Sequence, residues 1–418
     1  MTFLDHARRD ELAGLVERTV CQTPVLDIHT HLHDPAFGGL LLRGLDEMLV
    51  YHYLVAEAFR FHDVAPARFF ALPKPEQAEL VWRELFVAHS PLSEACRGVL
   101  TTLHRLGLDP RARDLSALRG WFAQWEPAAH VDRVLALANV RGVTMTNSPF
   151  DDAETPLWRA GLGRDPRFHA ALRIDPLLVA WPEATARLFD RGFVSTGEPN
   201  TATLDGVRRF LAEWTRRTVP RYVMASLPPS WRYPDDSDAC RVLEEAVLPH
   251  CREHGLPLAL MMGVKRGVNP ALQLAGDGVG GADLGSLQNL CAAWPENRFL
   301  VTVLARENQH ELAVLARKFA NLHPFGCWWF VNVPSLIEEI TRLRLELLGP
   351  SFTPQHSDAR VLDQLVYKWD HSRQILARVL TDKYTHLAAA GWWPTDEEVR
   401  RDVQQLLGGA FEAFCAKA

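Results

Sequence analysis

The stretch Val25-Leu26-Asp27-Ile28-His29-Thr30-His31 is a short apolar run that ends in two histidines one residue apart. Residues i and i+2 of a β-strand point to the same face, so we expect His29 and His31 to offer two imidazoles to one point in space. Such a pair is typical of metal ligands. A lone His-x-His pair also occurs by chance, so a metal site needs a further ligand from elsewhere in the chain.

The chain has 418 residues, of which 47% are hydrophobic and 23% are charged. This composition is typical of a globular protein, and the length suits an α/β barrel with insertions. The formal net charge is −6, and the Lys and Arg residues are spread along the chain rather than clustered. We therefore expect no nucleic-acid partner and a small-molecule ligand met by a few local arginines.

Seven cysteines are scattered along the chain without a Cys-x-x-Cys pair, which predicts reduced thiols that mostly pack in the interior. Residues 1–16 lack the apolar core of a signal peptide. No apolar run approaches the roughly 18 residues that span a bilayer. We expect a cytoplasmic protein without a membrane partner, and the sequence leaves open whether it forms a homo-oligomer.

The first part of the chain is mainly helical in pattern. A helix is expected near residues 4–21, and Thr23-Pro24 ends it before the opening strand. From residue 39 to about 138 the apolar residues recur at helical spacing, and no strand pattern is seen. We predict a helical insertion or subdomain at 35–138, placed after the first strand of a main domain formed by 1–34 and 139–418.

Short apolar or β-rich runs alternate with amphipathic helices in the rest of the chain. With the opening strand, the candidate strands lie at residues 25–31, 141–146, 168–174, 222–227, 257–262, 298–304, 325–330 and 351–357. Apolar strands separated by helices run parallel, so this count predicts an α/β fold, a (β/α)8 barrel of the TIM type. A doubly wound open sheet is the alternative, but it offers no reason for this count.

The chemistry of such a barrel lies at the carboxyl ends of its strands. Asp358 follows the last strand, which lies beside the first strand when the barrel closes. We therefore expect Asp358 to share one divalent metal ion with His29 and His31. This ligand set suits zinc, our first expectation, or manganese, iron or nickel, and it leaves coordination positions for water or substrate.

Several motifs, taken in order, resemble the uronate isomerase family, a branch of the amidohydrolase superfamily. The resemblance runs from about residue 24 to the C-terminal helix and includes the loop 263–285 after the fifth strand. The motifs are the His-x-His pair, His52-Tyr53 in the helical insertion, Arg173 after the third strand, Trp328-Trp329-Phe330, and Ser357-Asp358-Ala359-Arg360.

The resemblance implies a divalent-metal-dependent enzyme, an intramolecular oxidoreductase that interconverts a hexuronate aldose, such as glucuronate or galacturonate, with its ketose. It implies that the metal ligands are His29, His31 and Asp358. It also implies that the sugar is surrounded by Tyr53, His52, Arg173 and Arg360.

The expected reaction moves a proton between neighbouring carbons through an enediol, whose oxygens carry developing negative charge. Asp358 is the expected base, with a metal-bound hydroxide as the alternative, and Tyr53 could relay a proton. Arg173 and Arg360 would grip a carboxylate or an enediolate oxygen. The aromatic faces of Trp328 and Trp329 suit a sugar at the mouth of the barrel.

Structural roles are the alternatives for the same residues. Arg173 and Asp175 could form an ion pair at the strand end, and Asp358 with Arg360 could be a solvated pair. Tyr53 could belong to the ordinary core, and the tryptophans could serve packing alone.

The chain departs from the family pattern at three places. Met261 stands where members keep a histidine on the fifth strand, Ala225-Ser226 stands in place of an Asp-His-Gly signature, and Val331-Asn332 replaces an Asn-Asp pair. Methionine cannot replace imidazole as a hydrogen-bonding group or a hard-metal ligand. The alternatives are therefore a hydrolase, decarboxylase or lyase acting on a small carboxylate or sugar acid, and a non-catalytic sugar-acid sensor.

Overall fold

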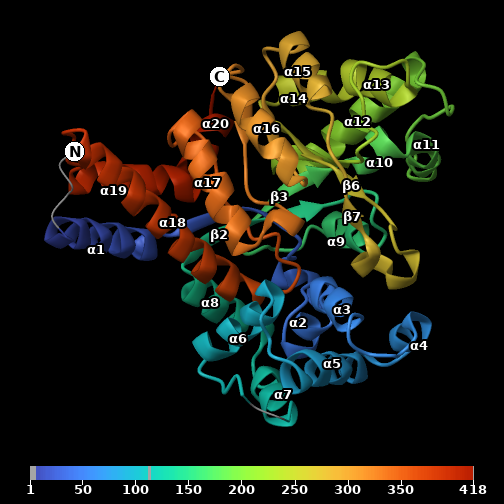
Figure 1. The fold of residues 1–418 in the computed structure, drawn as a ribbon. Coiled ribbons are helices and arrows are strands. Elements are labelled where there is room, and N and C mark those ends of the chain that lie inside the picture. Colours follow the sequence, from blue (N-terminus) through green and yellow to red (C-terminus); the bar gives the residue numbers. More distant parts are fainter. Residues whose placement is uncertain (1–5, 112–113, 418) are drawn as a thin grey trace.

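The computed structural model describes residues 6–111 and 114–417. One curled parallel sheet has the strand order β1-β2-β3-β4-β5-β8-β9, with helices on its outer side (Figure 1). Its strands are β1 (Val25–Thr30), β2 (Val140–Asn147), β3 (Phe168–Arg173), β4 (Pro220–Leu227), β5 (Leu258–Met262), β8 (Phe299–Val303) and β9 (Leu322–Pro324). The predicted α/β barrel class is confirmed, with seven regular strands.

The gap between β9 and β1 is closed by residues 351–360, which form no regular strand. At one end, the Thr353 N–H donates to the Pro324 carbonyl of β9 at 3.1 Å, and the Thr353 carbonyl accepts from the Gly326 N–H at 2.8 Å. At the other end, the Asp358 N–H donates to the His29 carbonyl at 3.2 Å, and the His31 N–H donates to the Ala359 carbonyl at 2.8 Å. Because this segment reaches both edges, the sheet is a closed barrel and the doubly wound alternative is excluded.

The predicted eighth strand, residues 351–357, is therefore wrong as a regular strand, although the segment lies where that strand was expected. Pro354 has no N–H to donate, and Asp358 has a left-handed φ of 53°. A regular ladder of backbone hydrogen bonds cannot continue through either residue.

The predicted seventh strand at 325–330 is also wrong, because β9 ends at Pro324 and the aromatic run forms a short 3-10 helix at Trp329–Val331. Gly326 turns the chain away from the sheet with a φ of 66°. A Cβ at this position would lie 1.7 Å from His356 Nδ1, so glycine alone fits.

The interior of the barrel is filled by apolar side chains from several strands. They form one buried cluster that includes Leu26, Ile28, Ala171, Tyr222, Met224, Ala259, Met261, Leu300 and Phe325. The C-terminal helix α20 (Ala410–Cys415) adds Phe411 and Phe414 to this cluster. Its Glu412 pairs with Arg141 at the start of β2, so α20 covers the amino end of the barrel.

The chain between β1 and β2 is helical, and it lies below the barrel in Figure 1. Its α-helices are α2 (Leu45–Leu49), α3 (His52–Ala58), α4 (Pro66–Phe70), α5 (Lys74–Trp82), α6 (Glu94–Arg105), α7 (Ser116–Ala123) and α8 (Pro127–Ala138). Helices α2 to α7 share a hydrophobic cluster of their own, whereas α8 contributes Val131 and Val134 to the main core. That 35–138 forms a separate unit stays a prediction.

The remaining helices follow the later strands. They are α9 (Glu154–Ala160), α10 (Asp175–Val179), α11 (Trp181–Asp190), α12 (Thr201–Thr218), α13 (Asp238–Val242), α14 (Leu248–Glu253), α15 (Leu284–Ala293), α16 (Gln309–Ala316) and α17 (Pro334–Leu348). A small antiparallel hairpin of β6 (Val264–Lys265) and β7 (Gly278–Val279) follows β5, and the sequence pattern did not predict it.

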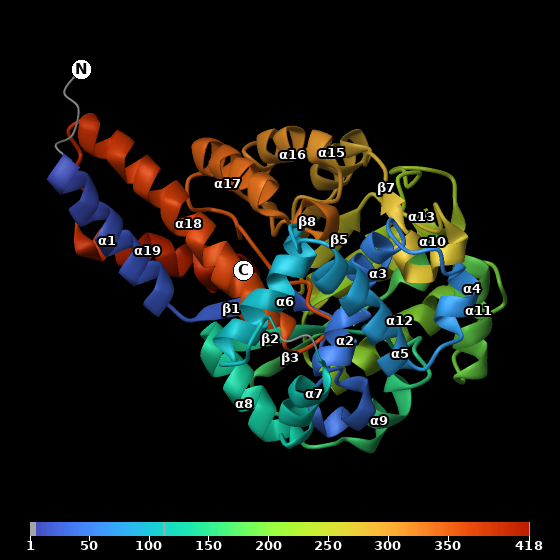
Figure 2. The ribbon, with the colours of Figure 1, turned by 60° about the horizontal axis from the view of Figure 1, so that its bottom comes forward.

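Three helices form an arm that projects from the barrel (Figure 2). They are α1 (His6–Gln22), α18 (Gln364–Ala389) and α19 (Asp396–Gln404). The predicted first helix is confirmed for its described part, while residues 4 and 5 of that prediction lie outside the described residues. No helix within the described ranges is long and apolar enough to cross a membrane.

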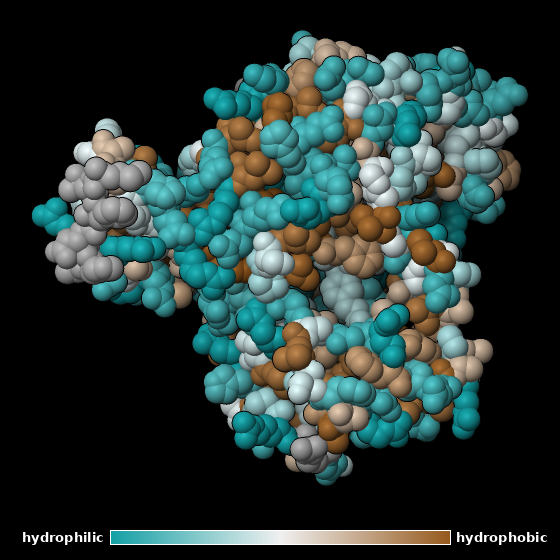
Figure 3. Space-filling model, viewed as in Figure 1, coloured by the Kyte–Doolittle hydropathy of each residue, from teal (hydrophilic) through white to brown (hydrophobic). Residues whose placement is uncertain are grey.

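The face shown in Figure 3 carries small hydrophobic patches among polar side chains, and it is hollowed between the barrel and the helices below it. Leu274 and Phe330, which are 52% and 40% exposed, line a cavity together with residues of α3. This side of the barrel is therefore open to ligands.

A pH-dependent stability difference tests the packing at the end of β9. His323 is buried, with Nε2 2.9 Å from Thr353 Oγ1, and burial lowers its pKa from 6.5 to about 3. Below pH 6.5 the unfolded chain binds a proton that the folded chain does not. Between pH 7.5 and 5.5 the free energy of unfolding of the wild type should then fall relative to that of His323→Gln by about 1.4 kcal/mol in total, mostly below pH 6.5. Urea unfolding at pH 7.5, 6.5 and 5.5 measures this, and a pH-independent difference contradicts it.

Candidate active site

His29, His31 and Asp358 converge at the carboxyl end of the barrel. One ligand atom of each lies within 4.8 Å of the others. His29 Nε2 is 3.7 Å, and His31 Nε2 is 3.3 Å, from Asp358 Oδ1. The structure thus brings together the three residues that the sequence predicted as one cluster.

The strand that presents His29 is irregular. Three steps along β1, from Asp27 to Thr30, match two steps along β2, from Val143 to Met145. This mismatch is typical of a β-bulge, which re-aims the side chains beside it. The local irregularity therefore lies where β1 turns its first histidine toward the cluster.

Asp358 is held against β1 by the buried carboxylate of Asp27. Asp27 Oδ1 accepts from the Ser357 N–H at 3.1 Å, and Oδ2 accepts from Trp369 Nε1 at 2.9 Å. Burial raises the pKa of Asp27 to about 6, while these hydrogen bonds favour its charged form. Asp27 therefore links the ligand-bearing segment to both β1 and α18.

The hydrogen bonds around His29 assign its tautomer. The Tyr222 hydroxyl donates to the Ile28 carbonyl at 2.7 Å, and its oxygen lies 3.2 Å from His29 Nδ1. Because the single hydroxyl proton is used, the oxygen accepts from His29 Nδ1–H. His29 Nε2 then carries a lone pair that faces the cluster.

Hydrogen bonds assign the tautomer of His31 in the same way. The Thr146 hydroxyl donates to the Thr30 carbonyl at 3.1 Å, and its oxygen lies 3.0 Å from His31 Nδ1. It therefore accepts from His31 Nδ1–H, which leaves a lone pair on Nε2. Hydrogen bonds of this kind orient metal-bound imidazoles and set which nitrogen faces the ion.

The donor atoms of the cluster fit a cation. Burial lowers the pKa of His29 to about 3 and that of His31 well below 6.5, so both imidazoles are neutral. His29 Nε2 and Asp358 Oδ1 are buried and have no hydrogen-bond partner among the described residues. Two lone pairs and a carboxylate oxygen facing one another repel unless positive charge lies between them. This set could hold a divalent metal ion.

A cavity around the cluster, here called the inner cavity, contains most of the predicted site residues. It is lined by His29, His31, His52, Arg173, Ser226, Met261, Arg266, Trp328, Trp329, Asp358 and Arg360. Trp329 and Asp358 both have left-handed φ values, 46° and 53°. Backbone strain of this kind is concentrated at functional sites.

Tyr53 is the predicted site residue that does not line the inner cavity. It lines a neighbouring cavity of about 260 Å³, here called the side cavity, which shares His52 and Trp329 with the inner one. The Tyr53 ring lies 4.5 Å from the His52 ring and 4.8 Å from the Tyr51 ring, and the neighbouring Tyr51 hydroxyl contributes to the raised pKa of Tyr53. A ligand that reaches past His52 would meet the Tyr53 hydroxyl beside that of Tyr51.

The arginines of the inner cavity differ in their partners. Arg173 forms a two-point ion pair with Asp175, at 2.9 and 2.8 Å, so the predicted ion pair is present, and substrate binding by Arg173 stays a prediction. Arg266 pairs with Asp277. Arg360 makes no ion pair among the described residues, so the solvated pair with Asp358 is not observed there. Its guanidinium remains available to an anion.

The structure adds residues that the sequence did not assign to the site. Ser226 and Met261, noted above as departures from a family pattern, line the inner cavity at the ends of β4 and β5. Their position at strand ends was the signal that could have found them. Arg266 and Lys368, which line the inner and side cavities, carried no comparable signal, because neither lies at the end of a predicted strand within a recognised motif.

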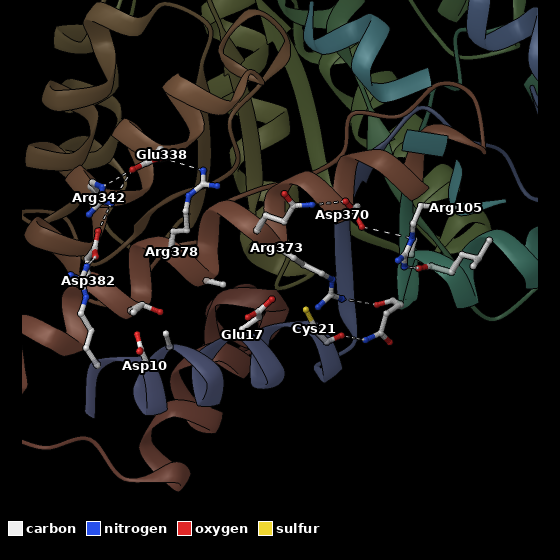
Figure 4. A pocket seen from close by; sticks show the side chains of 18 of the residues that line it. Asp10, Glu17, Cys21, Arg105, Glu338, Arg342, Asp370, Arg373, Arg378 and Asp382 are labelled. Carbon is white, nitrogen blue, oxygen red and sulfur yellow. Dashed lines mark hydrogen bonds and ion pairs between the residues drawn. The ribbon is translucent and has the colours of Figure 1, made fainter. Parts of the chain in front are cut away.

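A larger cavity, of about 1080 Å³, lies elsewhere, between α1, α17 and α18 (Figure 4). Several of its charged side chains are paired with one another: Asp382 with Arg9 and Arg342, and Glu338 with Arg342 and Arg378. Its wall includes Asn139, just before β2, which places it toward the amino ends of the strands. Barrel enzymes carry their chemistry at the opposite end, so this groove is not the candidate site.

The fold and the cluster define a class of protein: an α/β barrel with a histidine and carboxylate centre at the carboxyl ends of its strands. No family model matches the chain, and no curated protein matches it. Among solved structures, it is similar to a uronate isomerase from Bacillus halodurans C-125, with 51% identity, coverage of 98% of this chain and 97% of that chain, and a TM-score of 0.96. The chain belongs to the uronate isomerase family.

Two more distant structures share the fold. A uronate isomerase from Thermotoga maritima covers 99% of this chain and 100% of its own, and a glucuronate isomerase from Caulobacter crescentus covers 98% and 96%. Each is 15% identical to this chain with a TM-score of 0.76. At this identity the likeness shows the fold alone.

Metal titration tests the hydrogen-bond assignment at the cluster. Asp358→Asn should abolish stoichiometric Zn²⁺ binding, because one charged ligand is lost. Tyr222→Phe should weaken Zn²⁺ binding by about 10 to 100-fold, because His29 loses the acceptor that fixes its tautomer. Tyr384→Phe is the matched control, since its buried hydroxyl donates to Asp402 instead. Competition with a chelator measures the affinity, and equal affinities in the two tyrosine variants contradict the assignment.

Proposed function

We propose that this chain is a metal-dependent aldose–ketose isomerase that acts on a hexuronate of the glucuronate or galacturonate type. The observation that carries the proposal is the 51% identity, over almost the whole chain, to the uronate isomerase from Bacillus halodurans C-125. The cluster of His29, His31 and Asp358 at the carboxyl end of the barrel supports it.

His29, His31 and Asp358 would hold one divalent ion. Zinc suits two neutral imidazoles and a carboxylate, and manganese, iron or nickel are the alternatives. When bound, the ion would supply fixed positive charge and polarise an oxygen of the sugar.

The proton transfer needs a base and a relay. Asp358 Oδ1 faces both imidazoles, which leaves its second oxygen to take a proton from the sugar. Burial raises the pKa of Tyr53 well above 10, so its hydroxyl stays protonated and can donate to a sugar oxygen. We therefore assign Asp358 as the base and Tyr53 as the relay of an enediol mechanism.

The sugar acid would be held by the walls of the two cavities. Arg360 has no ion pair among the described residues, so it is better placed than Arg173 to bind a carboxylate or enediolate oxygen. Arg173, neutralised by Asp175, would add hydrogen bonds more than net charge. His52, Trp328 and Trp329 would contact the sugar faces.

A second candidate function is hydrolysis, decarboxylation or lyase chemistry on a small carboxylate or sugar acid. The observation that favours it is the position of Ser226 and Met261 on the wall of the inner cavity. Neither side chain can replace an imidazole or a carboxylate in proton transfer. The substrate is then the same class of compound, but a different bond is broken.

Proton NMR in D₂O tests the proposed reaction. Metal-loaded protein should convert glucuronate or galacturonate to the ketose, and the remaining aldose should exchange its C2 proton for solvent deuterium, because enediol formation transfers that proton to a base. No conversion of any hexuronate, with metal shown to be bound, would contradict the proposal. Turnover of esters, lactones or other carboxylates in parallel reactions would then support the second candidate.

The relay assignment predicts the effect of Tyr53→Phe. Loss of a positioned proton donor should lower kcat by about 10² to 10⁴-fold, while the metal content stays unchanged. Tyr384→Phe, at a buried tyrosine outside both cavities, serves as the control. Steady-state kinetics on the hexuronate found above measure the effect, and a kcat within about threefold of the wild type would exclude Tyr53 as the relay.

A further inference from the structure

We propose that Lys368 is a substrate-contacting residue whose ammonium pairs with a negatively charged oxygen of the sugar acid bound in the side cavity. The inference rests on the proposed function and adds to it a cation that no sequence motif indicated. It is argued from the burial of Lys368, its missing partner, and its position beside Tyr53 and His52.

Lys368 lies in the first turns of α18. Its side chain is buried, with 5% of the residue exposed, and it lines the side cavity together with His52, Tyr53 and Trp329. His52 and Trp329 also line the inner cavity. A ligand that extends from the metal cluster past these two rings therefore meets the ammonium of Lys368.

The ammonium has no carboxylate partner among the described residues. Its near neighbours are aromatic: Nζ lies 5.7 Å from the centroid of the Tyr53 ring and 5.4 Å from that of the Tyr367 ring. Aromatic faces stabilise a cation weakly. They do not replace the hydration that an ammonium loses on burial.

The carboxylates that line the same cavity are used elsewhere. Glu94 accepts from His371 at 2.6 Å and from Arg97 at 2.9 Å. Asp277 pairs with Arg266. Glu57 accepts from the Ser93 hydroxyl. Among the described residues that line the side cavity, Glu94 and Asp277 are therefore in ion pairs, Glu57 is hydrogen-bonded to a neutral hydroxyl, and Lys368 has no ion pair.

Lys368 is still charged near neutral pH. Burial lowers its pKa from 10.5 to about 8, and the negative charges of Asp358, Glu94 and Asp27 oppose this decrease. Of these three carboxylates, Asp358 opposes the decrease in pKa most, so the charge of Lys368 interacts with the metal cluster. A buried unpaired charge is costly to a fold unless a ligand compensates it.

Two oxygens of a sugar acid could take this position. The carboxylate is negative in the substrate itself, so pairing with it would strengthen substrate binding. The enediolate oxygen becomes negative during proton transfer, so pairing with it would lower the barrier without tightening the substrate complex. Both groups present an anionic oxygen to Lys368, and steady-state kinetics distinguish the carboxylate from the enediolate.

The test compares Lys368→Met, Lys368→Arg and Lys383→Met. Methionine keeps the length and apolar stem without the charge, and arginine restores the charge. Lys383 is the matched control, because it lies on the same helix and pairs with Glu346 at the surface. Thermal unfolding and metal content are measured for every variant. If Lys368→Met does not fold, Lys368→Arg is compared with the wild type instead.

For an enediolate contact, Lys368→Met should lose about 100-fold in kcat with little change in KM, as for the loss of one oxyanion donor. For a carboxylate contact, KM should rise and gluconate, an unreactive hexonate, should bind about tenfold or more weakly by calorimetry. Lys368→Arg should recover part of either loss. If Lys368→Met does not fold, a shift in either quantity in Lys368→Arg supports the contact.

The gluconate titration keeps this inference separate from the proposed function, because it needs no turnover. If the wild type converts no hexuronate, weaker gluconate binding in Lys368→Met than in Lys383→Met still supports the contact. With turnover present, kcat, KM and gluconate affinity that all match those of Lys383→Met overturn it. Without turnover, equal gluconate affinities or no gluconate binding to the wild type overturn it.

Discussion

The backbone pairing between β1 and the segment that follows the last strand position is the interaction on which the site depends. The His29 carbonyl accepts from the Asp358 N–H, and the Ala359 carbonyl accepts from the His31 N–H. These two bonds close the barrel and, in the same step, bring a carboxylate to two imidazoles. Asp27 strengthens the junction by accepting from Ser357 and Trp369. Closure of the sheet and assembly of the cluster are therefore one event.

The cluster brings two imidazole lone pairs and a carboxylate oxygen close together, and a cation between them would relieve their repulsion. Tyr222 and Thr146 use their hydroxyl protons on backbone carbonyls, so they can only accept from the histidines. Burial keeps both imidazoles neutral, and their lone pairs face a carboxylate oxygen. Such an arrangement has a large desolvation penalty and no internal compensation. A divalent ion would provide that compensation, so we interpret the donor set as a metal centre.

The two cavities divide the charges of the site between them. The inner cavity holds the cluster and Arg360, with Arg173 and Arg266 already neutralised by aspartates. The side cavity holds Tyr53 and the unpaired Lys368, and His52 and Trp329 form the wall common to both. An extended sugar acid that spans both cavities would meet positive charge at each end of its path. Ser226 and Met261 offer neither an imidazole nor a carboxylate to the inner cavity, so the proposed proton transfers are assigned to other residues.

The sequence by itself determined the α/β barrel, six of its strands to within a residue or two, and the trio His29, His31 and Asp358. These follow from local patterns: apolar runs, helical spacing, and the rule that strand ends meet at one end of a barrel. Only the tertiary structure decided that Gly326 turns the aromatic run out of the sheet, that Tyr53 lies behind His52, and that Lys368 faces a cavity. These depend on which distant segments pack together. A lysine in the first turns of a helix has the same sequence pattern whether it meets water or a buried ligand, and only the surrounding fold removes the water.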